Sequence, residues 1–115
     1  MNLILPWPPS GLSPNARLHH MAKHKLRSAY RTDCAWQAKA QGARAIKADA
    51  LRLRITFVPP DRRPRDLDNM LASIKSGLDG LADVLGVDDS KWSLEILRSA
   101  QVGGMVRVEV LPCTA

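Results

Sequence analysis

Acidic side chains are grouped at two places in the second half of the chain. Asp66 and Asp68 are separated by one residue, and the adjacent pair Asp88 and Asp89 follows about twenty residues later. Hard divalent cations such as Mg²⁺ prefer oxygen ligands, typically one or two carboxylates completed by water and substrate phosphate. A D-x-D pair in extended backbone presents both carboxylates on one side, where they can converge on one ion. The four carboxylates therefore predict a Mg²⁺ site, with Mn²⁺ as an alternative ion.

A purely structural role for the same carboxylates stays open. Asp66 stands where a helix N-cap is expected, Asp68 falls in the first helical turn, and Asp88-Asp89 is typical of a turn. The intervening helix spans roughly 30 Å, so Asp89 must fold back along it to meet the first pair. The strand that follows Asp89 can achieve this if it pairs near residues 57–60.

The charges of the chain are divided between a basic and an acidic segment. The net charge is +6, yet residues 16–65 hold thirteen Lys and Arg against three Asp, while residues 66–95 hold two Lys against seven acids. A basic chain of this size favours a polyanionic partner, usually nucleic acid. An acidic block beside the basic one suits a metal-dependent enzyme that acts on a polyanion. Solvated faces and intramolecular ion pairs explain the same pattern equally well.

Two segments supply candidate contacts to nucleic-acid phosphates, because Lys and Arg neutralise phosphates and release counterions. One segment leads into the second helix and holds Arg62, Arg63, Arg65 and Asn69. The other lies around the start of the first helix and holds Arg17, His20, Lys23, Lys25, Arg27 and Arg31. For the segment around the start of the first helix, the alternative to phosphate contact is an ordinary solvated helix start.

Hydrophobic periodicity predicts the elements that position these residues. The expected elements are a strand at 2–5, a Pro-rich loop at 6–16, a helix at 23–47, a strand at 51–58, a helix at 66–85 capped by Gly86, and strands at 92–99 and 105–111 joined as a hairpin through 102–104. The first helix is expected to bury Tyr30, Cys34 or Ala35, Ala38, Ala45 and Ile46, and an end or interruption at Gly42 is the alternative. The β-α-β-α-β-β order predicts one α+β domain over residues 1–115, with a mixed sheet packed by two helices.

Other features of the sequence limit the class of protein. No apolar run approaches the roughly 20 residues of a membrane span, and the N-terminus lacks the pattern of a secretory signal. The two cysteines, Cys34 and Cys113, are far apart in the chain. We therefore expect a cytoplasmic protein without a disulfide framework, a membrane partner or an organic cofactor.

Three blocks of the sequence resemble the RusA-type Holliday junction resolvases, which are small crossover-junction endodeoxyribonucleases. The blocks are Leu5-Pro6-Trp7-Pro8-Pro9-Ser10, the stretch PDRRPRDLDN at 60–69, and Asp88-Asp89. The resemblance implies a RusA-like homodimer that binds branched DNA and resolves four-way junctions by paired symmetric nicks during recombination and repair. It also implies dependence on Mg²⁺.

The resemblance also assigns roles to individual residues. It implies that Asp66, Asp68 and Asp89 are catalytic and bind Mg²⁺, with Asp88 as an additional acid, that Arg65 holds a phosphate, and that Asn69 positions a ligand. The family has a catalytic Lys at the position of Ala72 in this sequence. Lys75, three residues further along the helix, is the candidate replacement, and the alternative is that it pairs with Asp79 on the helix surface.

Two other functions stay open at this stage. The first is a non-catalytic protein that binds branched DNA, which the absence of Lys at position 72 favours. Retention of the acids opposes it, because carboxylates that face DNA without a metal repel it. The second is a nuclease that prefers flaps or forks to four-way junctions.

Overall fold

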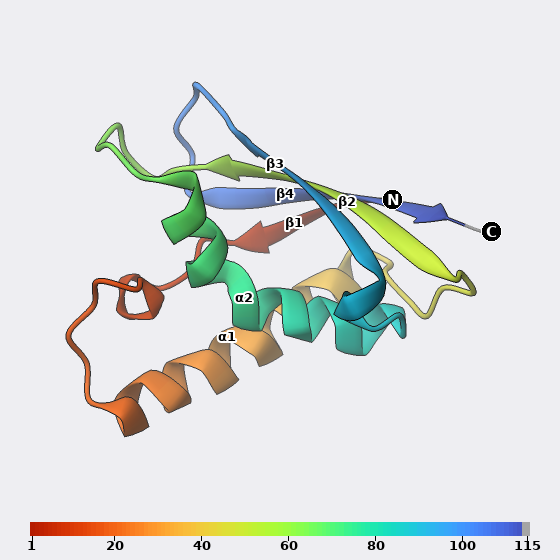
Figure 1. Ribbon diagram of the computed structural model, residues 1–115, viewed down its shortest axis with the longest axis horizontal. Coiled ribbons are helices and arrows are strands. Elements are labelled where there is room, and N and C mark those ends of the chain that lie inside the picture. The colour runs from red at the N-terminus through yellow and green to blue at the C-terminus, as the bar shows by residue number, and fades with distance from the viewer. Residues whose placement is uncertain (114–115) are drawn as a thin grey trace.

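Two helices cover one face of a four-stranded mixed sheet in the computed structural model of the chain, which describes residues 1–113 (Figure 1). The elements in order are β1 (Asn2–Pro6), η1 (Ser10–Leu12), α1 (His20–Ala40), β2 (Ala50–Val58), α2 (Leu67–Leu85), η2 (Asp89–Lys91), β3 (Trp92–Arg98) and β4 (Met105–Cys113). The expected α+β class and the β-α-β-α-β-β order are confirmed. Neither helix in the described part of the chain is long and apolar enough to cross a membrane.

The strands lie in the order β1-β4-β2-β3, and this order corrects the predicted hairpin. β3 pairs in parallel with β2, while β4 pairs antiparallel with the other side of β2, so β3 and β4 are not neighbours. The reason is that α2 forms the crossover connection that a parallel strand pair requires. The chain then passes over the end of β2, where the N–H of Gly103 donates to the carbonyl of Pro59 at 2.8 Å.

The core lies between the sheet and the helices. Leu51, Leu53, Ile55 and Phe57 alternate along β2 and are at most 1% exposed, as the sequence pattern predicts. The residues between them point to the opposite face of the sheet, where Arg52 and Arg54 are exposed. Strict alternation therefore shows that only one face of β2 is covered.

α1 is shorter than expected at its C-terminal end. Tyr30, Cys34 and Ala38 form its buried stripe, which confirms that part of the prediction. Ala45 and Ile46 lie beyond the helix, because the chain turns at Gly42, whose φ of +95° is accessible chiefly to glycine. The alternative end of the helix at Gly42 is therefore the one that the structure adopts.

Two glycines allow α2 to pack closely against α1. A Cβ atom at Gly80 would lie 2.2 Å from the carbonyl oxygen of Arg31, and one at Gly77 would lie 2.6 Å from the ring of Tyr30. α2 ends at Gly86 with φ of +74°, so the predicted C-cap is confirmed. The close contact fixes the position of α2, and with it the acidic residues at its start.

Candidate active site

The first pair of carboxylates lies where the chain enters α2. Asp66 occupies the N-cap position with extended backbone, but its side chain makes no capping hydrogen bond. Asp68 lies in the first turn, and both side chains are exposed. The positive end of the helix dipole favours carboxylates at this point. The structure therefore presents both groups to solvent rather than using Asp66 as a cap.

Asn69 connects the two carboxylates. Its Nδ2 lies at 3.5 Å from Oδ2 of Asp66 in a long hydrogen bond, and its backbone N–H donates to Oδ1 of Asp68 at 3.0 Å. Asp66 and Asp68 thus both contact Asn69, and each keeps a second oxygen for another ligand. The three polar residues of the predicted D-x-D-N block form one local group.

A cleft of about 600 Å³ opens beside this group. The Pro-rich segment that contains Trp7 and Pro8 forms one wall, while Arg65, Asp66 and Asn69 form another. Such a volume falls in the range of sites that hold small molecules or parts of larger ones. The cleft brings the N-terminal block and the central block of the sequence together in space.

Arg65 is held in position beside the cleft. Its guanidinium lies 5.6 Å from the ring of Trp7 and 2.9 Å from a carboxylate oxygen of Asp61, and its side chain is only 21% exposed. Trp7 in turn packs edge-on against Phe57 of the core. Hydrogen bonds from Arg65 and then from Arg63 lower the pKa of Asp61 well below its usual range. Asp61 was not among the residues expected at the site, although it lies two and four residues before these arginines in the sequence.

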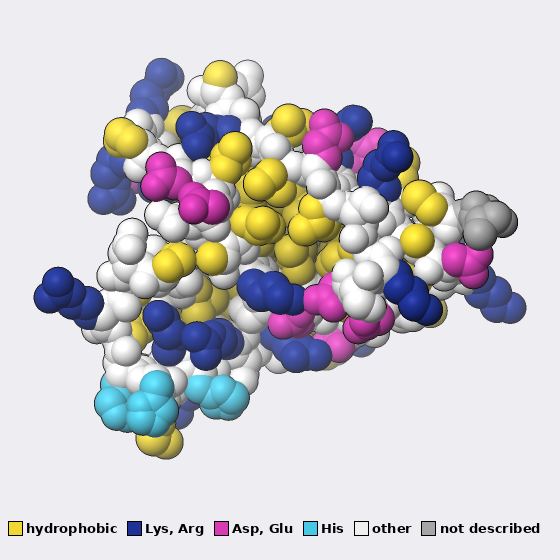
Figure 2. Space-filling view, in the orientation of Figure 1, with side chains coloured by type: hydrophobic (Ala, Val, Ile, Leu, Met, Phe, Trp, Pro, Cys, Tyr) yellow, Lys and Arg dark blue, Asp and Glu magenta, His cyan; other side chains and the backbone are white. Residues whose placement is uncertain are grey.

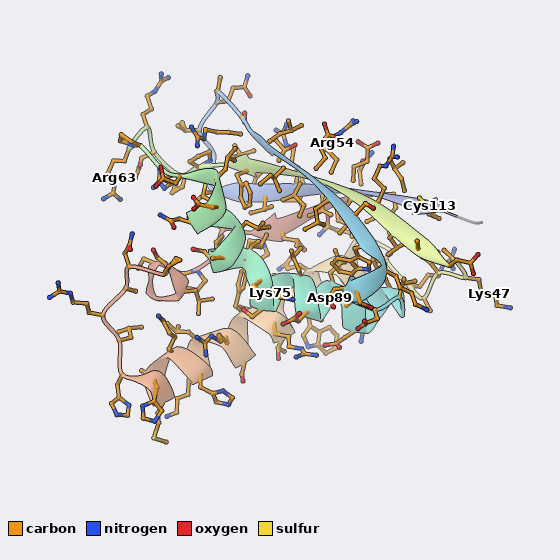
Figure 3. All side chains as sticks on the ribbon, viewed as in Figure 1. Lys47, Arg54, Arg63, Lys75, Asp89 and Cys113 are labelled. Carbon is orange, nitrogen blue, oxygen red and sulfur yellow. The ribbon has the colours of Figure 1, made fainter. Side chains whose placement is uncertain are left out.

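The second acidic pair lies at the start of β3. Asp88 caps the η2 turn by accepting hydrogen bonds from the backbone and hydroxyl groups of Ser90, and these bonds lower its pKa. Asp89 accepts a hydrogen bond at 2.6 Å from Nζ of Lys75 (Figure 3). The same Nζ donates to Asp79 at 2.9 Å. Hydrogen bonds to the two carboxylates raise the pKa of Lys75.

Within one subunit, Asp89 lies against Lys75 near the middle of α2, away from the first acidic pair. β3 does run back beside β2, but it starts opposite Leu51 and reaches Phe57 only at Arg98. The expected pairing of the start of β3 near residues 57–60 is therefore wrong. Among residues 1–113, no three His, Cys, Asp or Glu side chains form a group that could hold a metal ion. The pair Asp66 and Asp68 and the pair Asp88 and Asp89 are therefore two separate acidic groups.

The basic side chains around the start of α1 differ in their surroundings. Arg17, His20, Lys25 and Arg27 are exposed, and Lys23 is half-buried. Figure 2 shows basic side chains gathered beside the histidines at this end of the molecule.

A second cleft of about 250 Å³ runs between the two helices and is lined by Lys23 and Arg27 of α1 and by Lys75 of α2. Arg31 instead makes two hydrogen bonds of 2.8 Å to Asp83, which tie α1 to α2. Arg62 is exposed, and Arg63 is 81% exposed and paired with Asp61. Most of the predicted phosphate contacts are thus accessible, and Arg31 is also exposed while it forms an ion pair with Asp83.

The fold and site define an α+β protein in which Asp66 and Asp68 lie at the start of α2. Arg65 lines the cleft beside them, and Lys and Arg side chains line the second cleft between the helices. No family model matches the chain. The chain is 40% identical over 94 residues to an uncharacterized protein of Xylella fastidiosa, and the match covers 79% of this chain and 61% of the relative. The chain thus spans about three fifths of the length of the curated relative it matches.

Proposed function

We propose that the protein is a Mg²⁺-dependent endonuclease that resolves four-way DNA junctions. The observation that carries this proposal is the local group of Asp66, Asp68 and Asn69, of which Asp66 and Asn69 line a cleft together with Arg65. The resemblance of the three sequence blocks to RusA-type resolvases supports the same assignment. A basic surface next to an acidic site suits a polyanionic substrate.

The reaction is hydrolysis of one phosphodiester bond. A water oxygen adds to phosphorus while the bond from phosphorus to the leaving oxygen breaks, so the cut strand ends in one phosphate and one hydroxyl group. Arg65 binds a nonbridging phosphate oxygen through charge-assisted hydrogen bonds. Asn69 holds the carboxylate of Asp66 in place.

The residues present fit a Mg²⁺ ion. Two exposed carboxylates at one helix start match the one or two that this ion commonly takes from a protein, with water and substrate phosphate completing its shell. Asp66 and Asp68 would hold the ion. When bound, it lowers the pKa of water and offsets the charge that develops on the scissile phosphate. Mn²⁺, which prefers similar oxygen ligands, would substitute.

The remaining features of the proposal concern the substrate. Arg17, His20, Lys23, Lys25 and Arg27 would contact the backbone of the junction arms, so structure rather than sequence would dominate binding. A four-way junction has approximate twofold symmetry, and two matched nicks need two sites related by the same symmetry. A C2 homodimer meets that requirement. The protein would act in the cytoplasm, where it would associate with the nucleoid DNA.

A cleavage assay tests the proposal. Purified protein is incubated with labelled four-way junction, flap, fork and linear duplex, each with Mg²⁺, with Mn²⁺ and with chelator. We expect metal-dependent nicking of the junction, no cleavage by the Asp68→Asn variant, and wild-type cleavage by Asp33→Asn, which removes an exposed acid on α1. Preferential cutting of flaps or forks would change the substrate assignment.

A junction-binding protein without activity is the second candidate. Two observations favour it: position 72 is Ala, and Lys75 is hydrogen-bonded to Asp79 and Asp89 instead of Asp68. Tight junction binding with no cleavage under either metal would support this candidate and exclude the enzyme.

A further inference from the structure

The three tryptophans of the chain differ in how the fold uses them. Trp7 packs edge-on against Phe57 of the core, and Nε1 of Trp92 donates a hydrogen bond to the carbonyl of Val87 at 3.0 Å. Trp36 lies on the side of α1 opposite the buried stripe of that helix and is 66% exposed. Tryptophan is highly buried on average. The exposed indole of Trp36 is therefore free to contact a ligand.

A cleft lies beside this indole, between α1 and the C-terminal half of α2. Its volume is about 270 Å³, and besides Trp36 it is lined by Arg31, Thr32, Ala35, Lys39 and Asp83. Pockets that enclose a whole small molecule have volumes of roughly 300–1,000 Å³. The cleft therefore suits a flat part of a larger ligand. Close packing of the helices holds its walls together, since a Cβ atom at Gly80 would lie 3.4 Å from the backbone nitrogen of Ala35.

Two cations border the cleft. Nζ of Lys39 lies 5.6 Å from the centre of the Trp36 ring, a distance at which an ammonium group is attracted to the face of an indole. Arg31 binds Asp83 through its Nε and Nη2, so its Nη1 keeps N–H groups for a ligand. Because Arg31 offsets the carboxylate of Asp83, the charge of Lys39 is left to attract an anion.

These surroundings favour a nucleotide over a protein as the occupant. Lysine is depleted in protein–protein interfaces, whereas here it lies over the aromatic ring. The other lining residues are charged, polar or small, so the indole is a single aromatic platform rather than part of an apolar patch. An aromatic ring flanked by cations stacks on a nucleobase while the cations bind phosphate. Internal bases of a duplex are already stacked on both faces, so only an unpaired base would reach Trp36.

We infer that the cleft around Trp36 binds an unpaired nucleotide of a single strand, with the base stacked on the indole and the phosphates held by Lys39 and by Nη1 of Arg31. The cleft is separate from the candidate active site, because Asp83 lies fifteen residues beyond Asp68, roughly 22 Å along α2. The inference goes beyond the proposed function and does not rest on it, since binding at this cleft requires no Mg²⁺.

Fluorine NMR tests the stacking directly. The protein is labelled with 5-fluorotryptophan, and the signal of Trp36 is the one that disappears in the Trp36→Phe variant. A thymidine tetranucleotide is titrated into the wild type in the presence of chelator. We expect a saturable shift of the Trp36 signal, and no such shift with a long blunt duplex at the same nucleotide concentration. Absence of a shift with the tetranucleotide, or an equal shift with the duplex, would overturn the inference.

Substitutions of Trp36 test the affinity by equilibrium dialysis. Trp36→Leu keeps an apolar side chain but removes the ring, so we expect about 5- to 150-fold weaker binding of the tetranucleotide, the range for loss of one stacked base. Trp36→Phe keeps an aromatic ring and should retain most of the affinity. Met21→Ala, which removes another exposed apolar side chain of α1, should bind like the wild type. Equal binding by Trp36→Leu and Trp36→Phe would contradict the stacking.

The salt dependence of binding tests the phosphate contact. Each phosphate of a single strand that a cation neutralises adds about 0.7 to the slope of log affinity against log salt concentration. Lys39→Gln should therefore lower the magnitude of this slope by about 0.7. Arg107→Gln, which removes an exposed cation on the opposite face of the sheet, should leave the slope unchanged. An unchanged slope in Lys39→Gln would show that Lys39 does not hold a phosphate.

Further arms identify the strand and separate this inference from the proposed function. A uridine tetranucleotide in place of the thymidine one shows whether RNA or DNA is preferred, and either preference supports the site. Thymidine monophosphate that binds as tightly as the tetranucleotide would contradict a strand as the ligand. A protein that cleaves junctions without a response of Trp36 would overturn only this inference. A response of Trp36 in a protein that cleaves no branched DNA would overturn only the proposed function.

Discussion

The side-chain nitrogen of Lys75 lies 2.6 Å from Oδ2 of Asp89 and 2.9 Å from Oδ1 of Asp79. Hydrogen bonds to the two carboxylates raise the pKa of Lys75, so the group stays protonated well above neutral pH. A protonated Lys75 can offset negative charge but cannot accept a proton. It fixes Asp89 and the η2 turn against the middle of α2.

Replacing Lys75 by Met tests this role. Each exposed ion pair contributes about 0.2–1 kcal/mol, so we expect a small loss in the free energy of unfolding and a larger loss of junction cleavage. A raised folded-state pKa means that the stabilisation is present below the unfolded value of about 10.4 and is lost as pH rises through the folded value. Urea unfolding of both proteins from neutral to strongly alkaline pH should show their difference disappear at the alkaline end. Lys47→Met, which removes an exposed Lys, is the control.

Ala72→Lys adds a cation at the position where the resemblance expects one. Position 72 is exposed and lies four residues after Asp68 on the same helix. An acid followed by Lys at this spacing stabilises a helix by about 0.3–0.5 kcal/mol. We expect slightly higher stability and faster junction cleavage, compared with Ala72→Gln as a neutral control. Equal cleavage by the Lys and Gln variants would show that the enzyme needs no cation at this position.

The ion pairs of Asp61 predict a dependence of stability on acid pH. Hydrogen bonds from Arg65 and Arg63 lower the pKa of Asp61, so its stabilisation is present above the ordinary Asp value of about 3.9 and is lost as pH falls through the folded value. Asp61→Asn should be less stable than wild type at pH 7, and the two should converge in strong acid. Chemical unfolding across this range measures the difference. A constant difference at every pH would contradict the role of the charge.

Gly80→Ala tests the close contact of the two helices. The added Cβ would lie 2.2 Å from the backbone oxygen of Arg31, which cannot move without shifting α1. Overpacking of this kind typically costs about 1–3 kcal/mol, partly offset by the better helix propensity of Ala of about 1 kcal/mol. Ser76→Ala, on the same helix, removes a buried hydroxyl that lacks a hydrogen-bond partner in the described structure and should be neutral or stabilising. Thermal unfolding distinguishes the two variants.

Local patterns in the sequence predicted local structure well. The alternation along β2, the three-and-four spacing along α2 and the glycine after it are strong signals, and both β2 and α2 lie within one residue of their expected ranges. The group of Asp66, Asp68 and Asn69 was predictable for the same reason, since all three lie within one helical turn. The early end of α1 at Gly42 was only an alternative in the sequence, because the Ala-rich residues on both sides of this glycine favour helix.

Long-range relationships were less predictable. The predicted hairpin of β3 and β4 was wrong because the neighbour of β3 depends on how α2 packs, which short-range signals in residues 92–111 do not contain. The position of Asp89 depends on the same packing. The Arg31–Asp83 pair joins residues 52 positions apart, so no spacing rule in the sequence connects Arg31, an expected DNA contact, with its ion-pair partner.

The proposed function requires one homodimer to make two matched cuts in a four-way junction. A supercoiled plasmid with an inverted repeat that extrudes as a cruciform tests it most directly. A single nick releases the supercoiling and the cruciform is reabsorbed, so a linear product forms only when both cuts occur within one binding event. With Mg²⁺, we expect linear DNA cut at the base of the cruciform, and none with chelator or with Asp68→Asn. Nicked circles alone, or uncut plasmid with tightly bound protein, would contradict the claim.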